Sequence, residues 1–364
     1  MENQKLENTS RVMAEECLMW RKDNIDLIRG LMIIFVMAGH AIKYMIDTGR
    51  IDYAMGNWIY GAIYTFHMPV FFAIAGYVNF ISVQRNKDGI KDVVIKEIFS
   101  LYIPYLLLNF GCYLEKHLAE WGLGIYGQTS VPLSFKGAIS LFYKPDGISW
   151  FLFALFLIKI ISTLTKSLSE YVAPSFFAAV FVLYNIGVIE LPYVIYYISW
   201  GVFFEIGYFA SKYSFCNAQN RKRTAACLIS CVIAITVGII LFMSQMNEFE
   251  FTVKFLIGSG LFLMLLMIPE TKCNIKPLAF LGKNTMIVYI VHGLTGYIAY
   301  LIVNAFVKNG YIIVLGMICL QSLLAYLCYL LMIKVRWMHW LEYIFYPYRL
   351  LKKIIYATRD TAMK

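Results

Sequence analysis

The stretch LIRGLMIIFVMAGHAIKYMI, residues 27–46, decides how this chain folds, because it is an apolar run of the roughly 20 residues that cross a bilayer as one helix. Within it lie Arg29 and His40, and ionisable groups inside a membrane span are costly and commonly functional. Their interval of eleven residues is three helical turns plus about 20°, so both side chains share one face. Asp26 joins that face one turn earlier. The run therefore predicts a membrane helix that carries a polar, chemically active stripe.

The composition indicates a polytopic membrane protein. Of 364 residues, 60% are hydrophobic and 15% are charged, against roughly 45–50% and about 25% in soluble domains. The net charge of +10 does not indicate nucleic-acid binding, because Lys and Arg gather in alternate loops, as membrane topology requires. The eight cysteines are scattered without a CxxC pair and lie mostly in apolar spans, which is typical of small core residues and predicts no metal site.

Apolar windows predict about ten membrane helices, so the predicted fold class is an all-α integral membrane bundle. The predicted spans cover residues 27–46, 57–81, 98–118, 148–166, 172–189, 193–213, 225–243, 252–269, 285–306 and 312–333. Lys and Arg follow the second, sixth and eighth spans, whereas the alternate loops nearly lack them. By the positive-inside rule, an even number of spans with both termini in the cytoplasm follows.

The chain divides into three predicted segments. Residues 1–26 form a cytoplasmic N-terminal tail, and residues 27–333 form the membrane domain. Residues 334–364 mix Trp, Tyr and Phe with Lys and Arg, a pattern typical of a helix that lies on the cytoplasmic leaflet.

Polar residues recur in other predicted spans, where each needs a partner or a water-filled cavity: His67, Lys159, Glu205 and His292. His67 precedes a proline, and two interpretations stay open: a histidine bonded to a backbone carbonyl, or part of a substrate site. His292 either completes a site from the ninth span or packs helices together. Trp150, at the start of the fourth span, either stacks on a sugar ring or belongs to the interfacial aromatic belt.

The polar stripe of the first span carries residue types suited to acyl transfer. A neutral imidazole at His40 can take a proton from a hydroxyl near neutral pH, or can itself carry an acyl group. Arg29 offers a fork of donors for phosphate or carboxylate at the cytoplasmic end, and Asp26 can orient it. The structural alternatives are a histidine buried for packing and an ordinary Asp–Arg pair at the helix base.

These residues belong to an ordered set of short motifs that resembles the bacterial acyltransferase family 3. The motifs are Arg21-x-x-x-x-Asp26-x-x-Arg29-Gly30, Gly39-His40, Phe66-His67-Met68-Pro69, Phe71-Phe72, Gly76-Tyr77, Trp150-Phe151-Leu152, Gly207-Tyr208 and Leu281-Gly282-Lys283-Asn284-Thr285 with Tyr289 and His292. Each is weak alone, but together they run from residue 21 to residue 333 in the family's order. The resemblance identifies residues 27–333 as an acyltransferase domain of about ten helices.

The resemblance also implies roles for individual residues. His40 matches the family's catalytic histidine, and Arg29 matches its partner arginine. Many members carry Arg-x-x-Arg before the third span, whereas this chain has KDVVIK at residues 91–96. Contacts to the donor phosphates are therefore expected from Arg29 and from the basic loop residues Arg85, Lys91 and Lys96.

We therefore expect a membrane O-acyltransferase that moves an acyl group, acetyl by family resemblance, from cytoplasmic acetyl-CoA to a hydroxyl of a cell-surface or exported polysaccharide. Catalysis is assigned to His40, Arg29 and Asp26, and substrate contacts to His67, Trp150 and His292. The expected location is the bacterial inner membrane, with acyl-CoA, a glycan or lipid-linked sugar and membrane lipids as partners, and with neither metal nor nucleic acid. The alternatives are a secondary transporter or glycan exporter that uses the buried charges as a path, and a sensor or scaffold.

Overall fold

The computed structural model describes residues 2–85, 89–123, 133–185, 194–213, 221–244, 250–267 and 275–362. Every regular element within these ranges is helical, which confirms the all-α prediction. The principal helices are α1 (Glu2–Asp47), α2 (Tyr53–Tyr64), α3 (His67–Arg85), α4 (Ile90–Glu97), the π-helix η1 (Ile98–Tyr102), α5 (Ile103–Leu123), α6 (Phe135–Ser140), the short η2 (Gly147–Ser149), α7 (Trp150–Lys166), α8 (Val172–Asn185), α9 (Val194–Ser199), α10 (Gly201–Lys212), α11 (Arg221–Met243), α12 (Glu250–Met267), α13 (Lys276–Lys283), α14 (Thr285–Phe306), α15 (Gly310–Lys334), α16 (Leu341–Phe345) and α17 (Pro347–Ala362).

Eight stretches of the described chain are long and apolar enough to cross a membrane, so the protein is a multi-pass membrane protein. They lie on eight of the ten predicted ranges. The predicted range 172–189 falls on α8, which is shorter, and the range 193–213 falls on α9 and α10, which are separated at Trp200. The count of ten spans stays a prediction, as does the side of the membrane on which each terminus lies.

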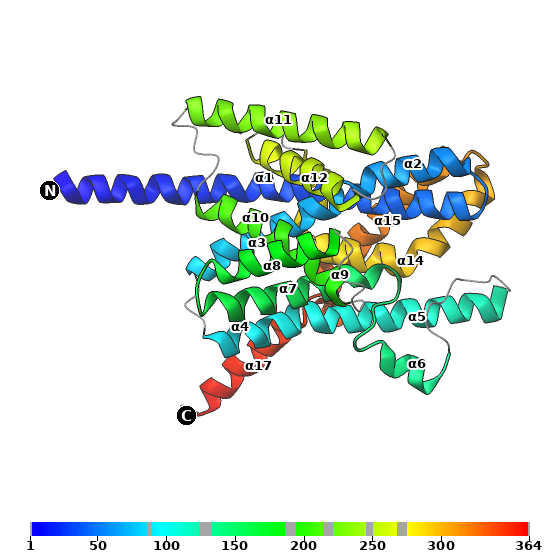
Figure 1. The fold of residues 1–364 in the computed structure, drawn as a ribbon. Coiled ribbons are helices and arrows are strands. Elements are labelled where there is room, and N and C mark those ends of the chain that lie inside the picture. Colours follow the sequence, from blue (N-terminus) through cyan, green and yellow to red (C-terminus); the bar gives the residue numbers. More distant parts are fainter. Residues whose placement is uncertain are drawn as a thin grey trace.

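The helices form one bundle whose long members run side by side (Figure 1). We call the end that holds Asn24 of α1 and the start of α17 the tail end, and the end where residues 48–52 join α1 to α2 the hairpin end. α14 follows α1 in the same direction, since Gly282, just before it, touches α1 at Asp26, and Gly296 within it touches Tyr44. Positions 26 to 44 of α1 therefore run from the tail end towards the hairpin end.

Two glycine crossings hold the bundle together. A Cβ at Gly30 would meet the backbone carbonyl of Leu278, and a Cβ at Gly282 would meet that of Asp26, so α1 and α13 touch backbone to backbone. Only glycine allows such an approach between helices. The same reciprocal contact joins α3 to α10 through Gly76 and Gly207. Gly30, Gly282, Gly76 and Gly207 are therefore packing residues, and the first crossing places Arg29 beside the α13–α14 junction.

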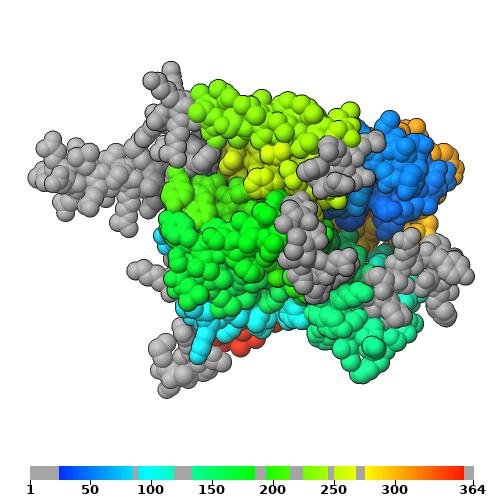
Figure 2. All heavy atoms as spheres, in the orientation of Figure 1, coloured from blue at the N-terminus to red at the C-terminus, as the bar shows by residue number. Residues whose placement is uncertain are grey.

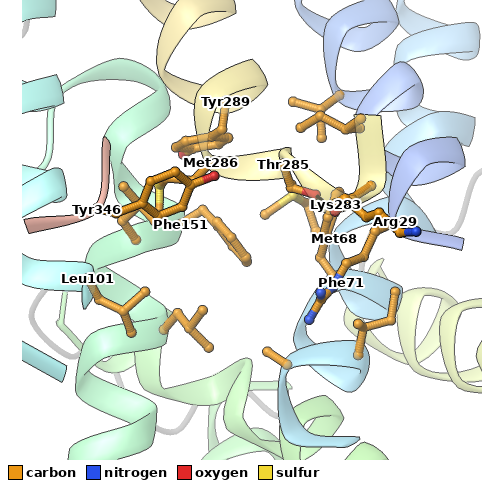
Figure 3. A pocket seen from close by; sticks show the side chains of 17 residues that line it. Arg29, Met68, Phe71, Leu101, Phe151, Lys283, Thr285, Met286, Tyr289 and Tyr346 are labelled. Atoms are coloured by element: carbon orange, nitrogen blue, oxygen red, sulfur yellow. Dashed lines mark hydrogen bonds between the residues drawn. The ribbon is translucent and has the colours of Figure 1, made fainter. Parts of the chain in front are cut away.

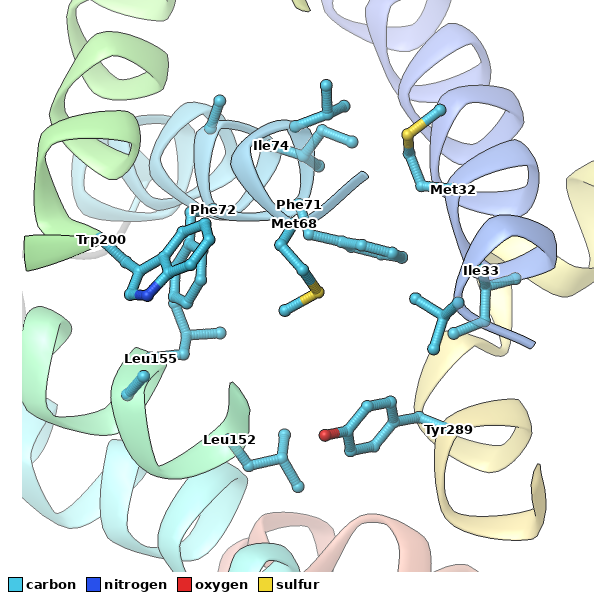
Figure 4. Packing of buried hydrophobic residues seen from close by; sticks show 14 of the residues in the cluster. Met32, Ile33, Met68, Phe71, Phe72, Ile74, Leu152, Leu155, Trp200 and Tyr289 are labelled. Carbon is cyan, nitrogen blue, oxygen red and sulfur yellow. The ribbon is translucent and has the colours of Figure 1, made fainter. Parts of the chain in front are cut away.

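The core is apolar and rich in aromatic rings. Figure 4 shows side chains from α1, α3, α7 and α14, among them Met32, Phe71, Leu152 and Tyr289, that belong to one buried cluster. On the outside of the bundle, α11 leaves most of its apolar side chains exposed (Figure 2), as expected for a helix that faces lipid.

Buried ion pairs explain two of the polar residues found in the predicted spans. Lys159 of α7 binds Glu97 of α4 at 2.8 Å, and Glu97 is only 2% exposed. Lys166 of α7 binds Glu205 of α10 at 2.8 Å, and Glu205 also accepts a hydrogen bond from Ser162. Lys159 and Glu205 therefore join α7 to its neighbours, because a charge buried between helices requires a partner.

Candidate functional site

The larger of two cavities that concern the predicted site lies towards the tail end and has a volume of about 280 Å³. We call it the tail-side cavity. Its body is apolar, built by α1, α3, η1, α7 and α14 with side chains such as Ile33, Met68, Phe71 and Leu155. A cavity of this size and character suits an extended, mostly apolar ligand segment.

The polar groups of the tail-side cavity are few. Arg29, Lys283 and Thr285 lie on one side in Figure 3, with Tyr346 and Phe151 opposite. Arg29 lies 3.6 Å from the buried carboxylate of Asp26, an ion pair that both interpretations of these residues contain and that holds the guanidinium in place. Two cations at one opening form a site for an anion such as a phosphate. Burial raises the pKa of the Tyr346 phenol, which therefore stays a hydrogen-bond donor at neutral pH.

The smaller cavity, of about 40 Å³, lies further along α1, and we call it the histidine cavity. His40 and Tyr44 of α1, His292 of α14 and Gln321 of α15 line it. The rings of His40 and His292 have centroids 5.6 Å apart. His40 makes no hydrogen bond to another described residue, so its nitrogens are available to a ligand. Within the described ranges no group of three or more His, Cys, Asp or Glu side chains is placed to bind a metal ion.

The other two predicted histidines are held by backbone carbonyls. His292 Nδ1 donates to the Val288 carbonyl at 3.2 Å, and His67 Nδ1 donates to the Ile63 carbonyl at 2.7 Å. His67 is 1% exposed and lines neither cavity, so the structure has the backbone-bonded arrangement that the sequence left open for it. The substrate role of His67 stays a prediction.

A hydrogen bond joins the linings of the two cavities. The hydroxyl of Tyr289, which lines the tail-side cavity, donates to the carbonyl of Ile148, which lines the histidine cavity. The two cavities share no lining residue. Arg29 and His40 occupy one helix, as predicted, but about 16 Å of helix rise separates them and they face different cavities.

Trp150 lies in the aromatic core. Its ring stacks on Tyr197 with centroids 6.2 Å apart and packs against Trp200 at 5.5 Å and Phe72 at 6.3 Å. It lines neither cavity, although the next residue, Phe151, lines the tail-side cavity. A sugar-stacking role for Trp150 stays a prediction.

Lys91 and Lys96, two of the basic loop residues expected to bind the donor, do not line the tail-side cavity. Lys96 donates to Ser82 at 3.0 Å, and Lys91 is exposed on α4. The side chain of Arg85 lies outside the described residues. The second cation of the cavity is instead Lys283, which the charge pattern had suggested only as a topology signal. The sequence did contain a signal for Lys283 as the second cation, because Arg29 is next to Gly30 and Lys283 is next to Gly282.

Comparisons with known proteins agree with these observations. The family model described as acyltransferase domain matches residues 22–345. The nodulation protein NolL of Mesorhizobium japonicum is 27% identical over 151 residues, which cover 39% of this chain and 36% of that relative. The nodulation protein NolL of Sinorhizobium fredii is 36% identical over 58 residues, 16% of each chain. The matched part thus spans well under two thirds of these relatives. No solved structure matches the chain.

Proposed function

The chain belongs to the acyltransferase family whose model matches residues 22–345, and we propose that it transfers an acyl group, taken to be acetyl, from cytoplasmic acyl-CoA to a hydroxyl of a cell-surface or exported polysaccharide. The observation that carries this proposal is the arrangement along α1. Two cations open onto an apolar cavity, and a histidine lies about 16 Å further along the same helix.

The tail-side cavity supports CoA as the donor. Arg29 and Lys283 are the residues that would hold its phosphates, because guanidinium and ammonium groups bind phosphate through charge-assisted hydrogen bonds. The apolar walls beyond them suit the long pantetheine arm. The separation between Arg29 and His40 also favours a long donor, since a compact one could not touch both.

His40 is proposed as the general base of the transfer. It would take the proton of the acceptor hydroxyl while the oxygen bonds to the acyl carbon. The bond between that carbon and the CoA sulfur then breaks, and His40 returns the proton to the sulfur. In this proposal Tyr289 closes the way between the two cavities, so its hydrogen bond to Ile148 would open for the acyl group to reach His40.

The proposed location is the bacterial inner membrane, with the tail end in the cytoplasm, where the positive-inside pattern puts it. CoA would then enter from the tail end. A glycan or lipid-linked sugar would meet the histidine cavity from the hairpin end.

The direct test is mass spectrometry of surface glycans from cells that lack the gene and carry a variant of it. His40→Ala and Arg29→Ala should abolish one acyl mass that the wild-type gene restores. His339→Ala is the matched control, because His339 is exposed and lines neither cavity, and it should restore the mass fully. Undiminished acylation by both cavity variants would refute the proposal.

A second measurement separates the two roles open to His40. Purified full-length protein is incubated with radiolabelled acetyl-CoA and no acceptor. A labelled protein chain, absent from His40→Ala, means that the histidine carries the acyl group, whereas an unlabelled but active protein means general-base catalysis.

A further inference from the structure

Two buried atoms of the residues that line the histidine cavity can accept hydrogen bonds but receive none from the residues that the structure describes. They are Nε2 of His292 and Oε1 of Gln321, on side chains of residues that are 2% and 3% exposed. Both residues line the same small cavity, beside His40. Buried polar atoms are nearly always satisfied in proteins, so two unsatisfied acceptors at one cavity indicate a ligand that brings the missing donors.

The orientation of both side chains is fixed by a second hydrogen bond. A carbonyl only accepts, so the bond from His292 to the Val288 carbonyl places the proton on Nδ1 and leaves Nε2 with a lone pair. Gln321 Nε2 donates to the backbone carbonyl of His292 at 3.3 Å, which leaves Oε1 as the acceptor end. His292 cannot turn its Nδ1 proton towards the cavity without breaking the bond to Val288, and Gln321 cannot exchange its amide oxygen and nitrogen without breaking the bond to His292.

The size and chemistry of the cavity limit what can bind. Its 40 Å³ hold on the order of three water-sized groups, enough for hydroxyls and the carbons that bear them but not for a whole sugar ring. A carboxylate or phosphate brings no donor for Nε2 of His292 or Oε1 of Gln321. With His40 as the base, the residues that line the cavity carry more than one acceptor, whereas one hydroxyl has only one proton to donate.

We propose that the histidine cavity recognises two neighbouring hydroxyls of the acceptor: the reacting hydroxyl donates to His40, and its neighbour shares its single proton between Nε2 of His292 and Oε1 of Gln321 in a three-centre hydrogen bond. The proposal rests on the acyl transfer proposed above and names its substrate class, a vicinal diol such as the face of a sugar. His292 and Gln321 are positioning residues for the hydroxyl that reacts, and they leave the donor cavity unaffected.

A matched pair of substitutions tests His292. His292→Gln puts an amide oxygen near the place of Nε2 and keeps the cavity acceptor, whereas His292→Asn keeps only a donor near Nδ1 for the Val288 carbonyl. The hydroxyl role predicts near-normal glycan acylation for Gln and a loss of about tenfold for Asn, the worth of one hydrogen bond to substrate. If His292 only packs helices together, the bond to the Val288 carbonyl is what matters. His292→Asn, which keeps that donor, should then acylate better than His292→Gln.

The assay measures acyl mass per sugar repeat in cells that lack the gene and express each variant, with protein amounts matched by immunoblot. The affinity of the purified full-length protein for CoA, measured by calorimetry in nanodiscs, should stay within about twofold of the wild type, since no donor contact changes. Acyl groups that remain in His292→Asn should also spread over more than one hydroxyl in the NMR spectrum of the glycan. Asn equal to or better than Gln, or a parallel loss of CoA affinity, would overturn the proposal.

Gln321→Met provides an independent test that does not depend on how the histidine variants fold. Methionine has a similar shape and no strong acceptor, so it should reduce acylation about tenfold at unchanged CoA affinity, whereas full acylation would overturn the hydroxyl site. The two proposals fail differently. If the wild-type protein neither binds CoA nor acylates a glycan, the proposed acyltransferase function is wrong. If the wild-type protein transfers the acyl group but the His292 variants show the reverse order, only the proposed hydroxyl site is wrong.

Discussion

Gly282→Ala should separate Arg29 from Lys283 and thereby weaken CoA binding. The new Cβ would lie 2.6 Å from the carbonyl carbon of Asp26 and 3.0 Å from the backbone nitrogen of Gly30, against 3.4–4 Å for ordinary contact. The obstacle is backbone, so α13 has to move away from α1 by about 1 Å, and a displacement of that size in a binding site can cost about 10²-fold. We therefore expect the affinity for CoA to fall by about one to two orders of magnitude.

The assay is CoA binding to the purified full-length protein, with thermal unfolding measured on the same sample. Forcing a methyl group into a tight contact costs about 1–3 kcal/mol, so the variant should also unfold at a lower temperature. Gly61→Ala is the neutral control, because its Cβ would lie at an ordinary 3.6 Å from the ring of Phe242.

Gly207→Ala is the control for stability alone. Its Cβ would meet the backbone carbonyl of Ala73 at the crossing of α3 and α10, which carries neither cation. It should lower the unfolding temperature as Gly282→Ala does but leave the CoA affinity of the folded fraction within about twofold. If Gly282→Ala binds CoA like the wild type, the glycine crossing does not position the cations and the reasoning is wrong.

Three further outcomes follow from the contacts described. Lys283→Ala should weaken CoA binding about tenfold or more, the scale of a charged hydrogen bond, whereas Lys91→Ala should change it less than twofold; calorimetry compares the two. Tyr289→Phe removes the hydrogen bond between the linings of the two cavities, so it should raise the rate of acetyl-CoA hydrolysis in the absence of acceptor. Thiol release measures this rate, and an unchanged rate would contradict the proposed closure. Glu97→Gln leaves Lys159 as a buried charge without its carboxylate and should destabilise the protein by about 3–5 kcal/mol, whereas an unchanged unfolding temperature would mean that water reaches the pair.

The relations within α1 could be predicted from the sequence because they depend only on helical geometry. The spacing of Asp26 and Arg29 indicates the ion pair that the structure contains, and the spacing of Arg29 and His40 indicates a shared face. The wall between their cavities could not be predicted in this way. Tyr289 and Ile148 lie far apart in the chain, and their contact depends on how α14 packs against the start of α7.

The position of Lys283 in the proposed donor site could not be predicted from the sequence either, because it depends on a contact between helices far apart in the chain. Counting charges along the chain favoured the loop before the third span, because Lys91 and Lys96 stand close together there. The approach of Lys283 to Arg29 instead requires two helices far apart in sequence to cross at Gly30 and Gly282. A glycine next to a cation is a weak signal alone, and only the crossing gives it meaning.

Helix lengths explain the remaining difference between sequence and structure. An apolar window measures composition, so it cannot see that the residues around Trp200 break one predicted span into α9 and α10. Trp200 is 1% exposed and packs against Trp150 and Phe203, so the break lies inside the aromatic core rather than in lipid. Irregular backbone is tolerated at membrane depth only when protein or water surrounds it.

The sizes of the two cavities also bear on the transporter alternative. An exporter has to pass a whole sugar along its path, yet the histidine cavity holds on the order of three water-sized groups. An acetyl group has three heavy atoms, so the histidine cavity is large enough for it but too small for a sugar. The buried charges that a transporter would use are also engaged, since Glu97 and Glu205 each bind a lysine. Cavity dimensions and ion pairing therefore favour passage of an acyl group between two fixed sites over passage of the glycan itself.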